Sequence, residues 1–365
     1  MIVRMSCISA FLFCCAAMLV SQPHEPSGRS VWTGLGQRGG KVSISEMMKG
    51  ARILAGTCAN VGAGESVLIV ADAPMMPIAE AVAAAVRERQ AEPVIALMPT
   101  RTVDAEEPPR TIAAAMKSAD VIFSAVSVSI THTRATKEAV AAGARAIALT
   151  AFTQEMMVSG GIEADFPSIR IACKAMGARL ARASSARITT RQGTDLSFQL
   201  QGRRVNVMPG VVERGELSPV PNAEVNVSPV EGSANGVLVV DASIPYLGIG
   251  LLRQPIRFTV RNGFITGIEG GDPGQAGTLR AAWERQADSN VYNIAEMGIG
   301  MNPKCRFVGA MLEDEGVLGS IHIGTGTNIT LGGHIQARSH YDLIMKSPTL
   351  YLDGETVIED GQLKM

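Results

Sequence analysis

The first half of the chain alternates short apolar runs with longer amphipathic segments. Four apolar runs bounded by glycine or polar residues predict buried strands, at residues 66–71, 93–98, 120–126 and 144–149. Five segments with helical spacing of their apolar positions predict helices, at residues 43–61, 76–90, 110–118, 133–142 and 162–184. Strands that alternate with helices favour a doubly wound, mostly parallel sheet, so we expect an α/β domain over residues 43–184.

The second half follows a different pattern, in which apolar and polar positions alternate with period two. Residues 186–200 alternate around Gln192-Gly193-Thr194, and residues 256–268 alternate around Asn262-Gly263, a dipeptide typical of a type I′ hairpin turn. Residues 237–244 and 317–356 are also strand-like, with one short helix predicted at 279–287. We therefore expect a β-rich α+β domain over residues 185–365.

Residues 1–42 do not fit either pattern. Arg4 precedes an apolar run from Cys7 to Val20, which is short for a membrane span and has the length of a signal-peptide core. Residues 23–42 are rich in Pro and Gly; they contain a Gly-x-Gly-x-x-Gly match, but no predicted strand precedes it, so we exclude a dinucleotide loop. We interpret residues 1–42 as an upstream extension and linker. We expect a cytoplasmic protein whose main body does not insert stably in a membrane, with export as the alternative.

Composition narrows the possible partners and ligands. The net charge is −1, no basic run of five residues occurs and aromatic residues make up 4% of the chain, which argues against a nucleic-acid partner. Three of the six cysteines lie in the first fifteen residues and the others are singly placed, so neither a disulfide framework nor a C-x-x-C zinc site is indicated. Any metal would be held by nitrogen and oxygen ligands.

Candidate metal ligands gather between residues 293 and 342. This segment holds three of the five histidines, His322, His334 and His340. His340 and Asp342 form an H-x-D pair, and residues i and i+2 of a strand point to the same face. His322 lies between two isoleucines in another strand-like segment, which favours a shared metal site over two isolated polar residues. We keep His334, which follows two glycines, as a residue near the site.

Carboxylates extend the candidate set. Glu296 lies in the apolar stretch NIAEMGIGMNP, where an unpaired charge would be costly, and Glu224 lies in PNAEVNVSP. Glu313, Asp314 and Glu315 are consecutive, so at most one of them is expected to line a site. Two histidines with one carboxylate can form the facial triad of Fe(II) oxygenases, whereas two histidines with three carboxylates can hold two metals. The second arrangement uses Glu224 and Glu296, and the first leaves them without a role.

The histidine of the expected α/β domain, His132, stands alone. It lies at a predicted strand-to-helix junction and is expected to be a capping or surface residue.

Over residues 44–365 the chain resembles the thermophilic-aminopeptidase family, the aminopeptidase T and aminopeptidase S metallopeptidases, and more closely their leucyl-aminopeptidase-like branch. The resemblance is carried by four stretches, PNAEVNVSPVEGSANG, NIAEMGIGMNP, LEDEGVLGSIHIGTGTN and SHYD. It implies a homodimer that cleaves an amide bond of a small molecule or short peptide with a water activated by two divalent ions (Zn, Co or Mn). The implied metal ligands are Glu224, Glu296, His322, His340 and Asp342, with Glu231 or Glu313 carrying the proton.

The same scaffold is similar to 2,5-dihydroxypyridine 5,6-dioxygenase, which cleaves an aromatic ring with one Fe(II). In that resemblance the position of Glu296 is a histidine, and the position of His322 is not a ligand. Because this chain has Glu296 and His322 at those positions, we expect the hydrolase, with the dioxygenase acting on a dihydroxypyridine-like ring as the alternative.

Overall fold

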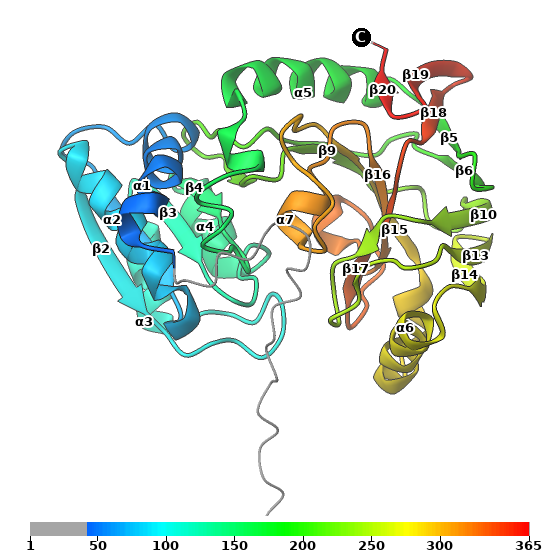
Figure 1. The fold of residues 1–365 in the computed structure, drawn as a ribbon, viewed down its shortest axis with the longest axis horizontal. Coiled ribbons are helices and arrows are strands. Elements are labelled where there is room, and N and C mark those ends of the chain that lie inside the picture. The colour runs from blue at the N-terminus through cyan, green and yellow to red at the C-terminus, as the bar shows by residue number, and fades with distance from the viewer. Residues whose placement is uncertain (1–41, 365) are drawn as a thin grey trace, which may run out of the picture. The chain divides into compact units, whose positions relative to one another are not determined.

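The computed structural model describes residues 42–364 (Figure 1), so the predicted extension and its apolar run lie outside the described residues. The first described helix, α1 (Ile44–Ile53), begins with a capping box: the Ser43 hydroxyl accepts from the Glu46 amide, and the Glu46 carboxylate accepts from the Ser43 amide. It continues into a π-helical turn, Leu54–Cys58. Within this part of the chain, no helix is long and apolar enough to cross a bilayer.

The first half forms a parallel sheet with helical connections, as predicted. Its strands stand in the order β2-β1-β3-β4-β8. The strands are β1 (Ser66–Ala71), β2 (Glu92–Leu97), β3 (Val121–Ala125), β4 (Arg145–Ala148) and β8 (Leu217–Pro219), and the connecting helices are α2 (Met76–Glu88), α3 (Arg110–Ser118) and α4 (Arg134–Ala141). The chain runs from β1 to one side and returns to β3 on the other, and ligands of such sheets bind at the carboxyl ends of strands beside that reversal.

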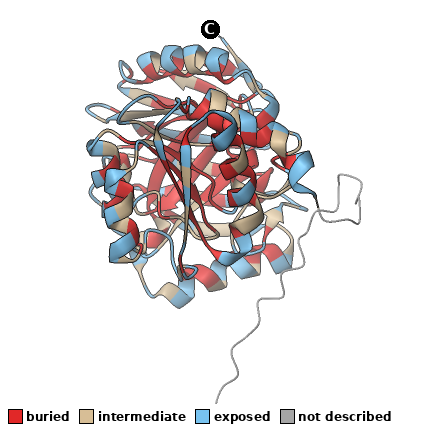
Figure 2. Cartoon of the chain, turned by 90° about the vertical axis from the view of Figure 1, so that its left-hand side faces the viewer, coloured by how far each residue is buried: buried red, intermediate tan, exposed pale blue. Residues whose placement is uncertain are grey.

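One face of this sheet is covered by α3 and α4. Leu68 and Val70 of β1 and Ile122 of β3 pack in one buried cluster with Met116 of α3 and Ala139 of α4. In Figure 2 the helices present exposed outer faces while the strands behind them are buried. Side chains on both faces of β1 are buried, and for this reason its sequence is a continuous apolar run.

The second half contains two antiparallel sheets. The larger has the order β14-β13-β10-β6-β5-β18-β19-β20. Its strands are β5 (Ser185–Thr189), β6 (Asp195–Gln199), β10 (Asn235–Val240), β13 (Ile256–Arg261), β14 (Phe264–Gly270), β18 (Thr349–Leu352), β19 (Glu355–Glu359) and β20 (Gln362–Leu363). Asn262 and Gly263 both have positive φ and join β13 to β14, which confirms the predicted hairpin.

The smaller antiparallel sheet carries most of the candidate chemistry. Its order is β12-β11-β17-β16-β15-β9-β7. Its strands are β7 (Val205–Met208), β9 (Glu224–Val227), β11 (Ser243–Ile244), β12 (Gly250–Leu251), β15 (Ile294–Gly300), β16 (Ile321–Gly326) and β17 (His340–Met345). Every residue of β15 is buried, so its sequence lacks the alternation by which a strand is predicted.

Three further helices are α5 (Phe166–Leu180), α6 (Pro273–Gln286) and α7 (Met311–Asp314). α6 begins earlier than predicted, because Asp272 caps the amides of Gly274 and Gln275 and Pro273 occupies the first turn. The predicted fold class, a parallel α/β sheet with a β-rich second half, is confirmed. The domain boundary at residues 184/185 stays a prediction, and β8 from beyond it pairs with β4 in the parallel sheet.

Candidate metal centre

Four adjacent strands of the smaller sheet present the predicted ligands. β9 carries Glu224, β15 carries Glu296, β16 carries His322, and β17 carries both His340 and Asp342. Residues directly opposite in an antiparallel pair project from the same face of the sheet. Three such pairings place the candidate residues on one face: Gly300 with Glu224, Gly298 with His322, and Gly324 with Asp342.

The carboxylate of Glu296 lies between the two imidazoles. Its Oε2 is 3.0 Å from His340 Nε2, and its Oε1 is 3.9 Å from His322 Nε2. His340 Nε2 is also 3.4 Å from Asp342 Oδ1, and His322 Nε2 is 3.5 Å from Glu224 Oε2. Two groups of potential ligand atoms result, Glu296 with His340 and Asp342, and Glu224 with Glu296 and His322.

Two glycines make room for the imidazoles. A Cβ on Gly298 would lie 2.0 Å from His322 Nε2, and a Cβ on Gly324 would lie 2.5 Å from His340 Nε2 and 2.8 Å from Glu296 Cβ. Both glycines stand two residues after a candidate ligand, in E-M-G and H-I-G, so they share its face of the strand. This repeated ligand-x-Gly pattern is visible in the sequence and marks the glycines that share a strand face with the ligands.

A second layer of polar groups fixes the ligands. His340 Nδ1 lies 2.8 Å from the Thr327 carbonyl oxygen, so it carries the proton and leaves the Nε2 lone pair for a metal. The Tyr246 hydroxyl lies 2.7 Å from Asp342 Oδ2 and 3.2 Å from Glu315 Oε1. The amide of Asn226 donates to Glu224 Oε1 over 2.7 Å. No local sequence pattern singles out Tyr246, which follows β11 and is brought to the site only by the fold.

The centre has an excess of buried negative charge. Glu224, Glu296, Glu315 and Asp342 are all less than 10% exposed, and within residues 42–364 none of them pairs with a lysine or an arginine. Burial disfavours a charged imidazole, but contact with Glu296 and the charge of Glu224 prevail and raise the pKa of His322 to about 9.

Burial and neighbouring carboxylates also shift the pKa values of Glu315 and His340. Burial and the carboxylates of Asp342 and Glu224 raise the pKa of Glu315 well above its usual value. Burial opposes protonation of His340, yet Asp342 and Glu296 raise its pKa well above the usual value. The cluster thus retains protons that a bound cation would displace, which is the behaviour of a metal site.

Glu231 and Glu313 do not belong to either ligand group. Glu231 pairs with Arg203 and accepts hydrogen bonds from the Asn328 amide and the His334 backbone, so it holds the loop after β16. Glu313 accepts from the backbone amides of Gly161 and Arg306. The proton-carrying role given to these carboxylates belonged to the hydrolase hypothesis, and their observed contacts are structural.

His132 approaches the centre from the parallel sheet. The residue that caps α4 is Thr133, whose hydroxyl accepts from the Thr136 amide, so His132 is not the cap. Its side chain is exposed to solvent, yet enough protein surrounds it that burial, followed by the charge of His340, lowers the pKa of its imidazole. A side chain that solvent reaches, although protein atoms surround it, lines a recess in the surface. His132 indeed lines a small pocket together with Asn206, whose amide donates to Asn226 over 2.7 Å.

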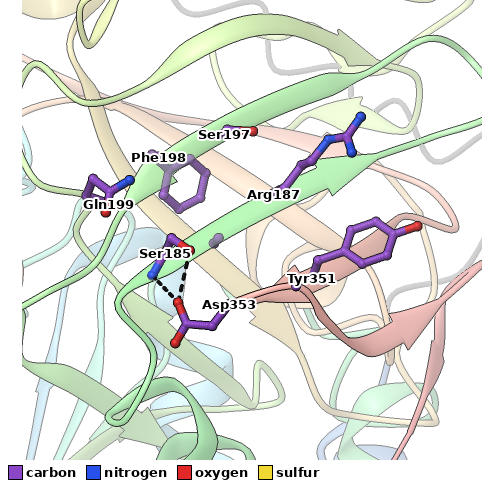
Figure 3. Close-up of a pocket in the computed structure, with 9 residues that line it drawn as sticks. Ser185, Arg187, Ser197, Phe198, Gln199, Tyr351 and Asp353 are labelled. Atoms are coloured by element: carbon purple, nitrogen blue, oxygen red, sulfur yellow. Dashed lines mark hydrogen bonds between the residues drawn. The ribbon is translucent and has the colours of Figure 1, made fainter.

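A separate hollow lies on the larger antiparallel sheet, between β5, β6 and β18 (Figure 3). Asp353 there accepts hydrogen bonds from the backbone and the hydroxyl of Ser185, and Arg187 pairs with Asp195. The hollow shares no residue with the metal centre. Because its charged groups are already paired, we assign it no chemistry.

Comparison with known proteins corrects the expected reaction. The 2,5-dihydroxypyridine 5,6-dioxygenase (NicX) family model matches residues 54–365. The 2,5-dihydroxypyridine 5,6-dioxygenase of Pseudomonas putida KT2440 is 28% identical over 197 residues, which cover 50% of this chain and only 55% of that relative.

Two solved structures share the fold. The 2,5-dihydroxypyridine dioxygenase from Pseudomonas putida KT2440 superposes with a TM-score of 0.76 at 22% identity, covering 88% of this chain and 98% of that one. AmpT from Thermus thermophilus superposes with a TM-score of 0.60 at 15% identity, covering 88% of this chain and 99% of that one. The resemblance to the aminopeptidases therefore holds for the fold.

The expected activity was wrong. Glu296 and His322 favoured a hydrolase of aminopeptidase type, but the family match extends over most of the chain and names a dioxygenase. Two residue identities cannot outweigh it, since carboxylate and imidazole ligands serve hydrolytic and oxidative metals alike. The family match therefore contradicts the expected protease and hydrolase activity. The chain belongs to the 2,5-dihydroxypyridine 5,6-dioxygenase family.

Proposed function

We propose that the protein is a non-haem, iron-dependent dioxygenase that opens the ring of a dihydroxypyridine-like aromatic. The family match over residues 54–365 supports the reaction class. The observation that carries the proposal to this chain is the group formed by Glu296, His340 and Asp342 on one face of β15 and β17. We assign one Fe(II) to these three residues.

The spacing of the three ligands suits a single ion. Neighbouring ligand atoms of an octahedral ion with bonds of about 2.1 Å lie about 3 Å apart. His340 Nε2 is 3.0 Å from Glu296 Oε2 and 3.4 Å from Asp342 Oδ1. Asp342 Oδ1 is buried and accepts no hydrogen bond, so a cation would satisfy an oxygen that otherwise lacks a partner.

The proposed ligand set differs from that of the dioxygenase resemblance. That resemblance has a histidine where this chain has Glu296, so the set here contains one imidazole and two carboxylates. Oxygen ligands and an imidazole suit a divalent iron, and the additional negative charge strengthens its binding. His322, whose Nε2 lies 3.5 Å from a carboxylate oxygen of Glu224 and 3.9 Å from one of Glu296, is left as an electrostatic neighbour of the ligands.

The residues around the ion have separate tasks. Iron, when bound, supplies the redox chemistry that lets dioxygen react with an electron-rich hydroxylated ring. The Thr327 carbonyl and the Tyr246 hydroxyl hold His340 and Asp342 in orientation. His132 lies close enough to the centre for the charge of His340 to act on it; burial and that charge lower the pKa of its imidazole, which favours the neutral form. We assign it the removal of a proton from a ring hydroxyl of the substrate.

The test is anaerobic reconstitution with Fe(II), followed by oxygen-uptake measurements on 2,5-dihydroxypyridine. We expect one iron per chain, oxygen consumption equimolar with substrate, and loss of bound iron in His340→Ala and Asp342→Ala. Arg134→Gln, an exposed substitution on α4, is the matched control. Full iron loading without oxygen uptake would refute the reaction. A second metal ion per chain would instead point to occupancy of the group formed by Glu224, Glu296 and His322.

A further inference from the structure

A pocket of about 160 Å³ lies beside the metal centre. His132 lines it, and the charges of His340 and Glu296 act on that imidazole. Asn206 of β7 also lines it and is linked through Asn226 to Glu224 by hydrogen bonds of 2.7 Å each. Two residues of the lining therefore connect the pocket to the metal centre, His132 through the charges of His340 and Glu296, and Asn206 through the hydrogen-bonded chain to Glu224. Its volume fits one small ring and excludes a peptide.

The charges of the pocket are opposite to those of the metal centre. Lys137 of α4 and Arg204, which precedes β7, both line it, and no aspartate or glutamate does. Neither side chain forms an ion pair with any residue between 42 and 364, although Arg204 donates to the Thr330 carbonyl over 2.9 Å. Two cations from separate elements thus face the same small cavity without a counter-charge.

Apolar side chains form part of the lining of the pocket. Val140, Met208, Leu217 and Leu331 line the pocket. Apolar walls contact the faces of an aromatic ring, while the charged groups at the rim fix its orientation.

We propose that this pocket selects a dihydroxypyridine that carries a carboxylate, which Lys137 and Arg204 bind while the ring hydroxyls face the metal centre. This inference rests on the proposed function and narrows its substrate class. Exposed lysines and arginines are usually solvated and contribute little. Lys137 and Arg204 differ from such solvated residues because both line one cavity, and no acidic residue lines it.

The experiment compares ring carboxylates with matched neutral carboxamides. Oxygen uptake by the iron-loaded enzyme is measured with 2,5-dihydroxypyridine and with its 3-, 4- and 6-carboxylate and carboxamide derivatives. We expect kcat/KM for one carboxylate isomer to exceed that of its carboxamide by about tenfold or more. Lys137→Gln and Arg204→Gln should each reduce that ratio by about fivefold, and the double variant should abolish it. Arg134→Gln, on the same helix but outside the pocket, should preserve the ratio.

Binding gives a readout that is independent of turnover. Anaerobic calorimetry with pyridine-3-carboxylate and pyridine-3-carboxamide should show tighter binding of the anion, with a preference that weakens as salt increases. Equal use of carboxylate and carboxamide by an enzyme that consumes oxygen would overturn the inference and leave the proposed function intact. Charge-dependent binding without oxygen uptake on any dihydroxypyridine would overturn the proposed function and leave the anion pocket.

Discussion

Gly324→Ala tests whether the face shared by β15, β16 and β17 is a metal site. A Cβ at this position would lie 2.5 Å from His340 Nε2, 2.7 Å from His340 Cε1 and 2.8 Å from Glu296 Cβ. Because non-bonded atoms in a close-packed interior do not approach within about 3 Å, the imidazole must retreat by about 0.5 Å or more. Metal–ligand distances tolerate changes of only about 0.2 Å. We therefore expect iron affinity to fall by about 10- to 100-fold.

The assay is an anaerobic Fe(II) titration against a competing chelator, with the melting temperature measured in parallel. Gly277→Ala is the matched control, because no atom lies near its added Cβ and alanine favours the interior of α6. Gly298→Ala gives a second comparison, since its Cβ would lie 2.0 Å from His322 Nε2 and displace that residue instead. If Gly298→Ala weakens iron binding more than Gly324→Ala does, His322 is a ligand and the assignment to His340 is incorrect. Iron binding by Gly324→Ala that equals the wild type would refute the reasoning.

Three other predictions follow from groups around the centre. Tyr246→Phe removes the hydroxyl that lies 2.7 Å from Asp342 Oδ2. Chelator competition should then show iron affinity reduced by about tenfold, while the melting temperature changes little. An unchanged iron affinity would mean that Tyr246 does not position the ligand. His132→Gln should lower kcat/KM by about 100-fold and remove the acidic limb of the pH profile of kcat/KM, with iron content retained. A pH profile shaped like that of the wild type would exclude His132 as the proton acceptor. The pKa of His322 in the folded metal-free protein, about 9, exceeds the usual value, so its protonation stabilises the fold fully below pH 6.5 and progressively less as the pH rises through 9. Urea unfolding of the metal-free protein should show this loss, His322→Gln should diminish it, and a stability that rises over the same range would contradict the assignment.

The parallel half was predictable because its central strands β1 and β3 are buried on both faces and its helices are amphipathic. The same burial concealed β15, whose residues between Ile294 and Gly300 are all buried and include two glycines, so period-two alternation is absent. The hairpin at Asn262-Gly263 was predictable from local backbone chemistry alone, since both residues must adopt positive φ.

The candidate ligands were identified in sequence, but their surroundings were not. An H-x-D pair on a strand aims two side chains at one point, which local geometry ensures. Tyr246 and Glu315 reach the same centre only through the order of strands in the sheet, and single-sequence patterns do not contain that order. The reaction class could not be derived either, because ligand type constrains the metal more than it constrains the chemistry.

The proposed ligands and the proposed selectivity residues come from different parts of the chain. Glu296, His340 and Asp342 all belong to one antiparallel sheet, whereas His132 and Lys137 belong to the loop and helix that follow β3. Substitutions at the pocket-lining positions Thr131, Lys137 and Val140 should therefore alter which rings enter without disturbing the strands that hold iron. Saturation mutagenesis for new substrates is best concentrated at these three positions, because they lie outside the strands of the metal centre and metal content reports directly on whether a variant has remained intact.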